Sequence, residues 1–323
     1  MIVDAHLDIA WNALAHGCRF DAPPARGRLV SRPALEAAGV GIVFCTIFCP
    51  PGGRALAGGF GYETPREAHL IARAQLGYYR SVGLPLIRDR RDLDRHLRRW
   101  RRQGPAGVLL MEGADPIESP GQMGWWAEQG VRIVGPAWGR TRYAGGTGEP
   151  GGLTPAGVEL LRAMRSTGTI LDLSHLADRA LTEALELWDG PVMASHSNAR
   201  RLVPGDRQLE DGTVMEIAAR GGMVGVSFCG GHLRADGRRP RLQDVVEQIA
   251  HLARVAGVEH VGLGTDLDGG FTAERAPLRR LEQLGELRRL LLRRFTGRET
   301  EGILGGNWIE FLRRNLALSK EGS

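Results

Sequence analysis

Histidine and carboxylate side chains recur in this sequence at the ends of short apolar runs, and side chains of these types bind divalent metal ions. In the run that opens the chain, His6 and Asp8 are separated by one residue. Residues spaced in this way on a strand project to the same side, so both could bind one ion. The pair alone is equally well explained as a buried histidine beside a solvated aspartate. A metal site is therefore predicted only if other apolar runs end in the same way.

Four further apolar runs end in the same residue types: Glu112, His175, His196, and the pair Asp266 and Asp268. A single strand-end histidine is better explained as a hydrogen-bonded loop anchor, and DLDGG alone as an ordinary turn. If the runs are parallel strands of one barrel, however, all these side chains meet at its carboxyl end. Three histidines together with carboxylates at one end of the barrel would suit two divalent ions. Nitrogen and oxygen donors favour Zn²⁺ and admit Mn²⁺, Co²⁺ or Fe²⁺.

The order of apolar and helical segments predicts such a barrel. Eight strands too apolar to face water alternate with helices, which favours an α/β fold, a single (β/α)8 TIM barrel with C-terminal helices, over a two-domain doubly wound fold. We expect one domain over 1–323, in which 299–323 form a C-terminal helix and tail. Strands are expected within 1–10 and at 39–48, 106–115, 131–138, 169–175, 191–197, 222–228 and 260–270. Helices are expected at 64–81, 91–103, 154–167, 177–188, 211–220, 241–256, 278–295 and 299–316, with a short helix within 119–130 and a loop at 9–38.

Composition narrows the class of protein. Of the 323 residues 42% are hydrophobic, enough for one large core. No run of about 18 uninterrupted apolar residues occurs, and the N-terminus does not resemble a leader. The four cysteines, Cys18, Cys45, Cys49 and Cys229, are too few and too scattered for a disulfide framework. We therefore expect a cytoplasmic protein that binds no membrane.

Nearly all the positive charge is arginine, and the net charge is +5. Arginine clusters at 88–102 and 278–294 interleave with acidic residues, and their leucines recur at helical spacing. This pattern is typical of solvated helix faces. Because no aromatic-studded basic groove or binding motif accompanies the charge, nucleic acid is not an expected partner.

The scarcity of lysine limits how two ions could be bridged. Many two-metal barrel hydrolases use a carboxylated lysine, but the single lysine here, Lys320, lies in the C-terminal tail. A carboxylate must bridge instead. Glu112 is the candidate, because its strand lies between the strand that carries His6 and Asp8 and the strands that carry the two later histidines.

Taken in order, the motifs DAHLD, MEGAD, GGLTPAG, LDLSH, ASHSNAR and GLGTDLDGG resemble the renal (membrane) dipeptidase family of two-zinc metallopeptidases, over nearly the whole chain. The resemblance implies Asp266 as the carboxylate that transfers protons and Arg207 as the residue that holds the substrate's carboxylate. Family members cleave dipeptides, often with a D-residue on the C-terminal side, and some open β-lactams or act on N-acyl amino acids. The family also suggests a homodimer. The implied ligands are His6 and Asp8 on one zinc, His175 and His196 on the other, and Glu112 bridging both.

One segment departs from the family pattern. The family usually places a substrate-binding histidine at the end of the fourth strand, where this chain has Trp138. An indole has one N–H as its only donor, so it cannot replace an imidazole fully. Arg140 or Arg142 in the following loop could supply a positive pole for the substrate instead. Solvent-facing arginines are an equally good explanation.

The predicted reaction is hydrolysis of an amide bond in a small substrate. A water shared by two ions is acidic enough to be hydroxide near neutral pH. Asp266 would take its proton and return it to the departing amine, and Arg207 would hold the free carboxylate. Two alternatives stay open: a related barrel hydrolase acting on N-acyl amino acids, lactones or other esters, and a catalytically altered binding protein, which Trp138 makes conceivable.

Three residues near these motifs have open roles. Asp4 and Asp172 lie close to candidate ligands in sequence, and they could orient imidazoles or simply anchor backbone. His232 follows the seventh predicted strand and could reach the same end of the barrel, although a structural role is the simpler expectation.

Overall fold

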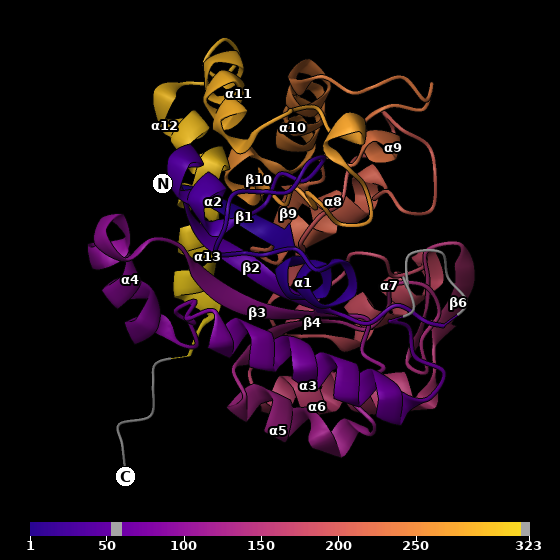
Figure 1. Ribbon diagram of the computed structural model, residues 1–323. Helices are drawn as coiled ribbons and strands as arrows, with labels where there is room; N and C mark the ends of the chain where they lie inside the picture. The colour runs from indigo at the N-terminus through magenta and orange to yellow at the C-terminus, as the bar shows by residue number, and fades with distance from the viewer. Residues whose placement is uncertain (53–59, 318–323) are drawn as a thin grey trace.

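A closed barrel of eight parallel strands forms the centre of the molecule, as predicted (Figure 1). The computed structural model describes residues 1–52 and 60–317. Around the barrel the strands follow the order β1-β10-β9-β8-β7-β4-β3-β2. Their bounds are β1 Ile2–Leu7, β2 Val40–Phe48, β3 Ala106–Glu112, β4 Val131–Gly135, β7 Ile170–Asp172, β8 Val192–Ala194, β9 Met223–Val226 and β10 Val261–Leu263.

Helices surround the barrel, with α3, α5 and α6 along one side and α10, α11 and α12 at the opposite side (Figure 1). The predicted start of α3 is confirmed: Thr64 caps the helix by accepting from the Glu67 N–H, and the Glu67 carboxylate accepts from the Thr64 N–H. The helices are α1 Ile9–His16, α2 Arg32–Ala38, α3 Pro65–Ser81, α4 Arg90–Gln103, α5 Met123–Glu128, α6 Pro155–Ser166, α7 Asp178–Leu187, α8 Asp211–Ala219, α9 Gly230–Leu233, α10 Leu242–Ala256, α11 Leu284–Leu291, α12 Gly297–Glu301 and α13 Asn307–Asn315.

The expected loop at 9–38 is partly wrong, because it contains α1 and α2. α1 begins directly after the first strand, and Gly17 ends it in a left-handed conformation (φ 67°) that glycine adopts without strain. α2 carries a capping Ser31, whose Oγ accepts from the Ala34 N–H. The cap in SRPALEAAG was therefore a usable sequence signal for α2.

Two other segments differ from prediction. Residues 144–153 form a two-stranded hairpin of β5 (Ala144–Gly146) and β6 (Glu149–Leu153), where a loop and a helix start were expected. The expected last helix is divided into α12 and α13 by a π-helical turn at Gly302–Gly306. Lys320 lies outside the described residues.

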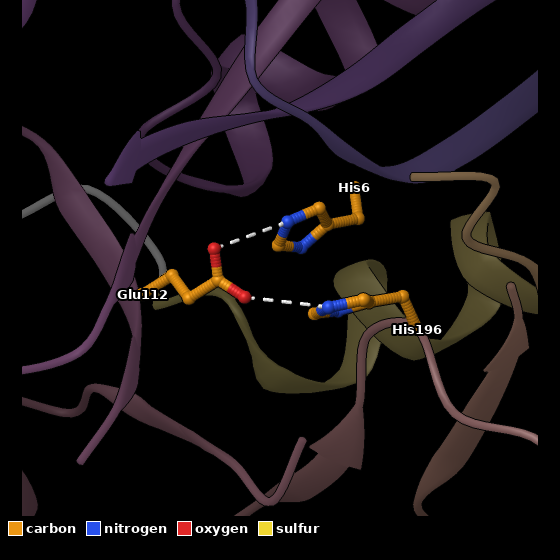
Figure 2. Close-up of side chains that lie close together, drawn as sticks. All are labelled: His6, Glu112 and His196. Carbon is orange, nitrogen blue, oxygen red and sulfur yellow. Dashed lines mark ion pairs between the residues drawn. The ribbon is translucent and has the colours of Figure 1, made fainter. Parts of the chain in front are cut away.

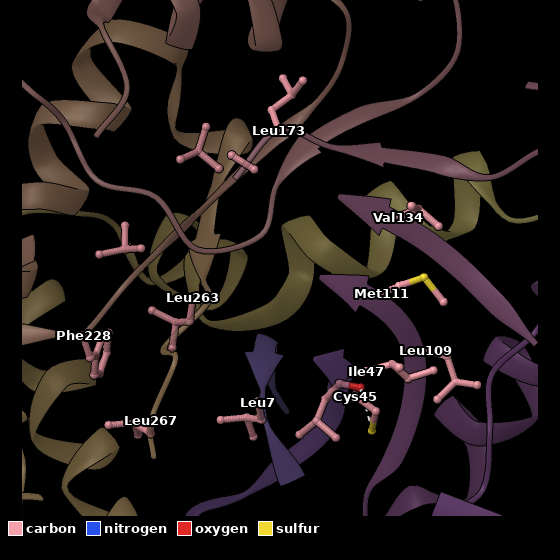
Figure 3. Close-up of a cluster of buried hydrophobic side chains, with 14 of the residues drawn as sticks. Leu7, Cys45, Ile47, Leu109, Met111, Val134, Leu173, Phe228, Leu263 and Leu267 are labelled. Carbon is pink, nitrogen blue, oxygen red and sulfur yellow. Dashed lines mark hydrogen bonds between the residues drawn. The ribbon is translucent and has the colours of Figure 1, made fainter. Parts of the chain in front are cut away.

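The barrel interior is filled by one cluster of apolar side chains. Val3 and Ala5 of β1 and Phe44 of β2 belong to it, together with Trp308 and Phe311 of α13. The Trp308 indole donates to the Leu263 carbonyl (3.0 Å), which fixes α13 against the barrel. A second cluster lies between strands and helices and includes Leu7, Ile47 and Met111 (Figure 3).

The first strand is irregular near the candidate ligands. Its pairing with β2 changes register between Asp4 and Leu7. Val3 before the irregularity and Ala5 within it belong to the inner cluster, whereas Leu7 belongs to the outer one. A bulge changes which side chains point inward, and this places His6 toward the interior.

None of the helices within residues 1–52 and 60–317 is long and apolar enough to cross a membrane.

Candidate metal centre

Four of the predicted ligands converge at the carboxyl end of the barrel. His6 lies in β1 and Glu112 is the last residue of β3, while His175 lies three residues after β7 and His196 two residues after β8. Figure 2 shows the Glu112 carboxylate facing the imidazoles of His6 and His196, with one oxygen directed to each. Glu112 Oε2 lies 3.5 Å from His6 Nε2, and Oε1 lies 3.1 Å from His175 Nε2 and 3.3 Å from His196 Nε2. One carboxylate therefore faces all three imidazoles.

Two further acidic candidates, Asp8 and Asp266, form a second group with His6. Asp8 Oδ2 lies 3.9 Å from His6 Nε2. Donor atoms of His6, Asp8 and Asp266 lie within 4.8 Å of one another, as do those of His6, Glu112 and His196. Asp8 stands at the N-cap of α1, yet its side chain makes no capping hydrogen bond. Its carboxylate is therefore available for another partner.

Two buried atoms in this cluster indicate what that partner is. His6 Nε2 and Asp8 Oδ1 have no hydrogen-bond partner among the described residues. Buried polar atoms are rarely left unsatisfied, because each costs about 1–3 kcal/mol. His175 Nε2 and His196 Nε2 also face each other at 3.1 Å. Nitrogen and carboxylate oxygen donors arranged in this way fit divalent metal ions.

The electrostatics favour a cation at the same place. Burial alone would lower the pKa of His6, but Glu112 and Asp8 raise it to about 10. Burial alone would raise the pKa of Glu112, but the facing imidazoles lower it well below its usual range. Burial lowers the pKa of His175 to about 4, so that imidazole keeps the free lone pair that metal binding needs. The cluster thus combines a negatively charged carboxylate with an imidazole that keeps its lone pair, which are the groups that bind a divalent cation.

A buried serine and aspartate hold two of the imidazoles. Ser195 Oγ lies 2.7 Å from His196 Nδ1 and 3.3 Å from His6 Nδ1. The Ser195 hydroxyl donates to Asp172 Oδ2 (2.5 Å), so it can accept from an imidazole N–H. A hydrogen on Nδ1 of His196 leaves Nε2 free to face Glu112. Asp172 therefore orients the His196 imidazole through Ser195.

The other predicted orienting residue, Asp4, anchors backbone instead. Its carboxylate accepts from the Thr265 N–H (2.8 Å) and hydroxyl (2.5 Å), and from the His6 N–H (3.3 Å). It thereby joins β1 to the segment that follows β10. His175 is oriented by a residue that the sequence did not indicate: Thr147, at the turn between β5 and β6, places its Oγ1 3.0 Å from His175 Nδ1.

The backbone is strained at two of the candidate residues. His175 (φ 69°) and Asp266 (φ 59°), with Asp268 (φ 65°), are the non-glycine residues at positive φ in the described part of the chain. Such conformations cost energy and concentrate at functional sites. A Cβ at Gly269 would lie 1.9 Å from Asp266 Oδ1, so glycine is needed there for the carboxylate to keep this position.

Asp266 and Asp268 face different surroundings, although sequence placed them together. Burial raises the pKa of the Asp266 carboxyl well above its usual range, and Asp8 and Glu112 add to the effect. The Asp268 carboxylate accepts from the N–H groups of Leu29 (2.9 Å) and Val30 (2.8 Å). It anchors the segment between α1 and α2, so the idea that it joins the cluster is wrong.

A cavity of about 180 Å³ opens over the cluster. Candidate ligands and Asp266 form its floor, while Trp11, Phe48 and Trp138 give it an aromatic wall. The Trp138 ring lies 5.2 Å from Phe48 and 6.0 Å from His175, between ring centroids. His232, for which sequence favoured a structural role, also lines this cavity.

The predicted arginines divide into two groups. Arg207 is buried beside the cluster and donates to the His196 carbonyl (2.5 Å) and to Ser197 Oγ (3.0 Å). Its Nε has no partner among the described residues. The exposed Arg140 donates to the Pro150 carbonyl (2.6 Å). None of the three arginines is among the residues that line the cavity, and Arg207 alone of them bonds to the segment that carries His196.

Arg142 has a structural task that explains its position. Its guanidinium donates to the Asp115 carboxylate (3.2 Å) and to the carbonyls of Asp115, Ile117 and Glu118 (each 2.9 Å). These bonds fix the segment after β3 and occupy each of its three nitrogens. The hypothesis that Arg142 supplies a positive pole to the substrate is not supported.

The fold and the cluster together define a barrel of the metal-dependent hydrolase type. Residues 1–321 match the family model described as membrane dipeptidase (peptidase family M19), and the chain belongs to this family. A protein in the pqqA 5′ region of Klebsiella pneumoniae is 36% identical over 177 residues, covering 51% of this chain and 65% of that protein. Dipeptidase tcpJ of Claviceps purpurea is 31% identical over 177 residues, covering 53% and 41%. The chain thus matches less than two thirds of these relatives' lengths.

Solved structures agree on the fold. A metallopeptidase from Rhodobacter sphaeroides, liganded with a phosphinate mimic of the dipeptide L-Ala-D-Ala, has a TM-score of 0.86 at 24% identity, covering 97% of this chain and 99% of that one. The probable dipeptidase PvdM from Pseudomonas aeruginosa has a TM-score of 0.83 at 18% identity, covering 97% and 94%. These likenesses support the barrel over its whole length.

Proposed function

We propose that this protein is a dipeptidase that hydrolyses the amide bond of small dipeptides with the help of two divalent metal ions. The observation that carries the proposal is the Glu112 carboxylate facing three imidazoles beside the unpartnered His6 Nε2 and Asp8 Oδ1. Family membership and the dipeptide mimic in the Rhodobacter structure support the substrate class. The donor set favours Zn²⁺. Cytoplasmic location and a homodimer stay predictions.

His6 and Asp8 would hold one ion, His175 and His196 the other, and Glu112 both. When bound, such ions polarise a carbonyl and make a nearby water acidic. The chain's own residues then position the reactants. Asp266, which lines the cavity, would take the proton of the attacking water and return it to the departing amine.

Arg207 would bind the free carboxylate of the substrate. It is buried among polar groups of the β8 end, and its charge lies close to His196 and Asp266. An arginine can contact a carboxylate through two parallel N–H groups, which selects a substrate that ends just past the broken bond. The aromatic wall of Trp11, Phe48 and Trp138 would exclude water around the substrate's side chains.

A substrate panel tests the proposal. Metal-loaded protein should cleave members of a set of L-Xaa-L-Xaa and L-Xaa-D-Xaa dipeptides, and lose turnover with a chelator and regain it with Zn²⁺. N-acyl amino acids, lactones and other esters in the same panel address the related-hydrolase alternative. Turnover of esters alone would overturn the dipeptidase proposal. Tight binding of dipeptides with no hydrolysis of any substrate, both ions being loaded, would favour the binding-protein alternative.

Ser195→Ala should weaken metal binding without unfolding the barrel. The variant removes the group that links His196 Nδ1 to Asp172, so the imidazole loses its fixed tautomer and orientation. Losing such a partner typically costs about 10- to 100-fold in metal affinity. Competition with a zinc chelator of known affinity measures the change. Ser166→Ala, on the exposed end of α6, is the control and should keep wild-type affinity; equal affinities in both variants would contradict the orienting role.

A further inference from the structure

One imidazole in the cavity has no part in the proposed reaction. His232 belongs to α9, the short helix that follows β9, and lines the cavity together with Cys229. Burial raises the pKa of the Cys229 thiol to about 11, so it stays a neutral, weak donor. His232 is thus the stronger hydrogen-bonding group of the two.

Two hydrogen bonds to neighbouring residues fix the position of His232. Its backbone carbonyl accepts from Asn198 Nδ2 (2.9 Å), and its Nδ1 lies 3.1 Å from Ser227 Oγ. Among the described residues, Nε2 has no hydrogen-bond partner, and it is not one of the fully enclosed atoms. The imidazole therefore has one nitrogen fixed by the protein and one open toward the cavity.

The hydrogen-bond pattern around Ser227 selects the tautomer. Ser227 is fully buried, and its Oγ accepts from the Cys229 N–H (3.2 Å). The hydroxyl hydrogen then needs an acceptor, and within residues 1–52 and 60–317 the nearby acceptor is His232 Nδ1. A hydrogen on Nδ1 would leave a buried hydroxyl without an acceptor, which is costly. The ring hydrogen consequently lies on Nε2, where it forms a donor at the cavity. Burial also lowers the pKa of His232 well below its usual range, so the ring is neutral.

His232 and Arg207 are joined by one short segment. Ser197 Oγ accepts from Arg207, and the adjacent Asn198 donates to the His232 carbonyl. The guanidinium and the imidazole are thus both tied to the segment that follows β8, and the charge of Arg207 is close enough to act on His232. His232 lines the cavity, whereas Arg207 lies buried behind its lining. A positive charge and a neutral N–H donor in the same region are complementary to a carboxylate.

We propose that His232 Nε2–H donates a hydrogen bond to the free carboxylate of the substrate beside Arg207, and so selects amides that carry a carboxylate close to the scissile bond. This inference rests on the proposed dipeptidase function. It specifies that the substrate's carboxylate lies beside the residues that follow β8 and β9. His232 contributes to substrate binding, and Asp266 keeps the proton transfer.

The test compares a dipeptide that the wild-type holoenzyme cleaves with the C-terminal amide of the same dipeptide. In His232→Ala the KM for the dipeptide should rise roughly tenfold or more, because a hydrogen bond to a charged group is lost, while kcat stays within about twofold. The amide lacks the carboxylate, so its kcat/KM should hardly change. His232→Gln keeps an N–H donor and should restore part of the loss. His251→Ala, at a histidine bonded to Asp211 away from the cavity, is the matched control.

Two results would overturn the inference: an unchanged KM for the dipeptide in His232→Ala, or a fall in kcat at constant KM, which would place the imidazole at the reacting carbonyl. If the alanine variant does not fold, Ser227→Ala serves instead. This variant keeps the imidazole but removes the hydroxyl that fixes its tautomer. The KM for the dipeptide should therefore rise less than in His232→Ala, and kcat/KM for the amide should again hardly change. An unchanged KM for the dipeptide would overturn the inference. A wild-type holoenzyme that cleaves no dipeptide overturns the proposed function, and the inference falls with it.

Discussion

Glu112→Gln should bind fewer metal ions per chain than the wild-type protein and lose at least roughly a thousandfold in amide turnover. Glu112 is the carboxylate that faces all three imidazoles, with oxygen-to-nitrogen distances of 3.1–3.5 Å. Glutamine keeps the size but replaces one charged oxygen by an N–H₂ group, which cannot bind a cation. Metal ions contribute several kcal/mol to such reactions, and about 1.4 kcal/mol is a factor of ten in rate.

Metal content by elemental analysis and turnover of a cleaved dipeptide are measured on the same preparations. Glu128→Gln, at an exposed position at the end of α5, is the control for loss of a negative charge and should match the wild type. Thermal unfolding with and without chelator adds a second readout, because a ligand that binds the folded state stabilises it. An undiminished metal content in Glu112→Gln would contradict the bridging role.

The barrel and its cluster were predictable from sequence because their signals are local. Parallel strands covered on both faces are continuous apolar runs, and every residue of β1, β2 and β3 is indeed buried. Once the strands are known to be parallel, the residue that ends each run must lie at the same end of the barrel. His6, Glu112, His175 and His196 follow this logic.

Residues beyond the strand ends could not be placed in the same way. Strand alternation would put Asp266 and Asp268 on one side, but β10 ends at Leu263 and both aspartates have positive φ, so alternation no longer applies. One carboxylate faces the cavity and the other binds the backbone of Leu29 and Val30. The sequence gives the residue types here, but it does not show where their side chains point.

Long-range partners explain the other differences. Arg142 is held by the segment 115–118, which lies about 25 residues earlier, and nothing in its own surroundings marks this pairing. His232 reaches the cavity because Asn198 and Ser227 hold it from two different strand ends. Thr147 reaches His175 through the β5–β6 hairpin, whose glycine-rich sequence resembles a loop. Such contacts depend on the closed barrel and become visible only in the structure.

Asp266→Asn should lower kcat for a dipeptide by roughly 10²- to 10⁴-fold while the bound metal stays in place. Asparagine has the same shape and still accepts hydrogen bonds, but it cannot take a proton from the attacking water. It also tolerates the positive φ of this position better than most residues. The expected signature is a large loss in kcat with little change in KM, because proton transfer matters only as the amide breaks.

Metal content decides between this role and a second one that the geometry allows. Donor atoms of Asp266 lie within 4.8 Å of those of His6 and Asp8, so the carboxylate could itself be a ligand. A ligand role requires that Asp266→Asn lose metal together with turnover, whereas a proton-transfer role requires wild-type metal content at reduced kcat. Asp268→Asn is the matched control, since it changes a buried carboxylate that also has positive φ but binds backbone N–H groups. It should lower stability by about 1–3 kcal/mol and keep kcat, which separates the chemistry of Asp266 from the general cost of altering this turn.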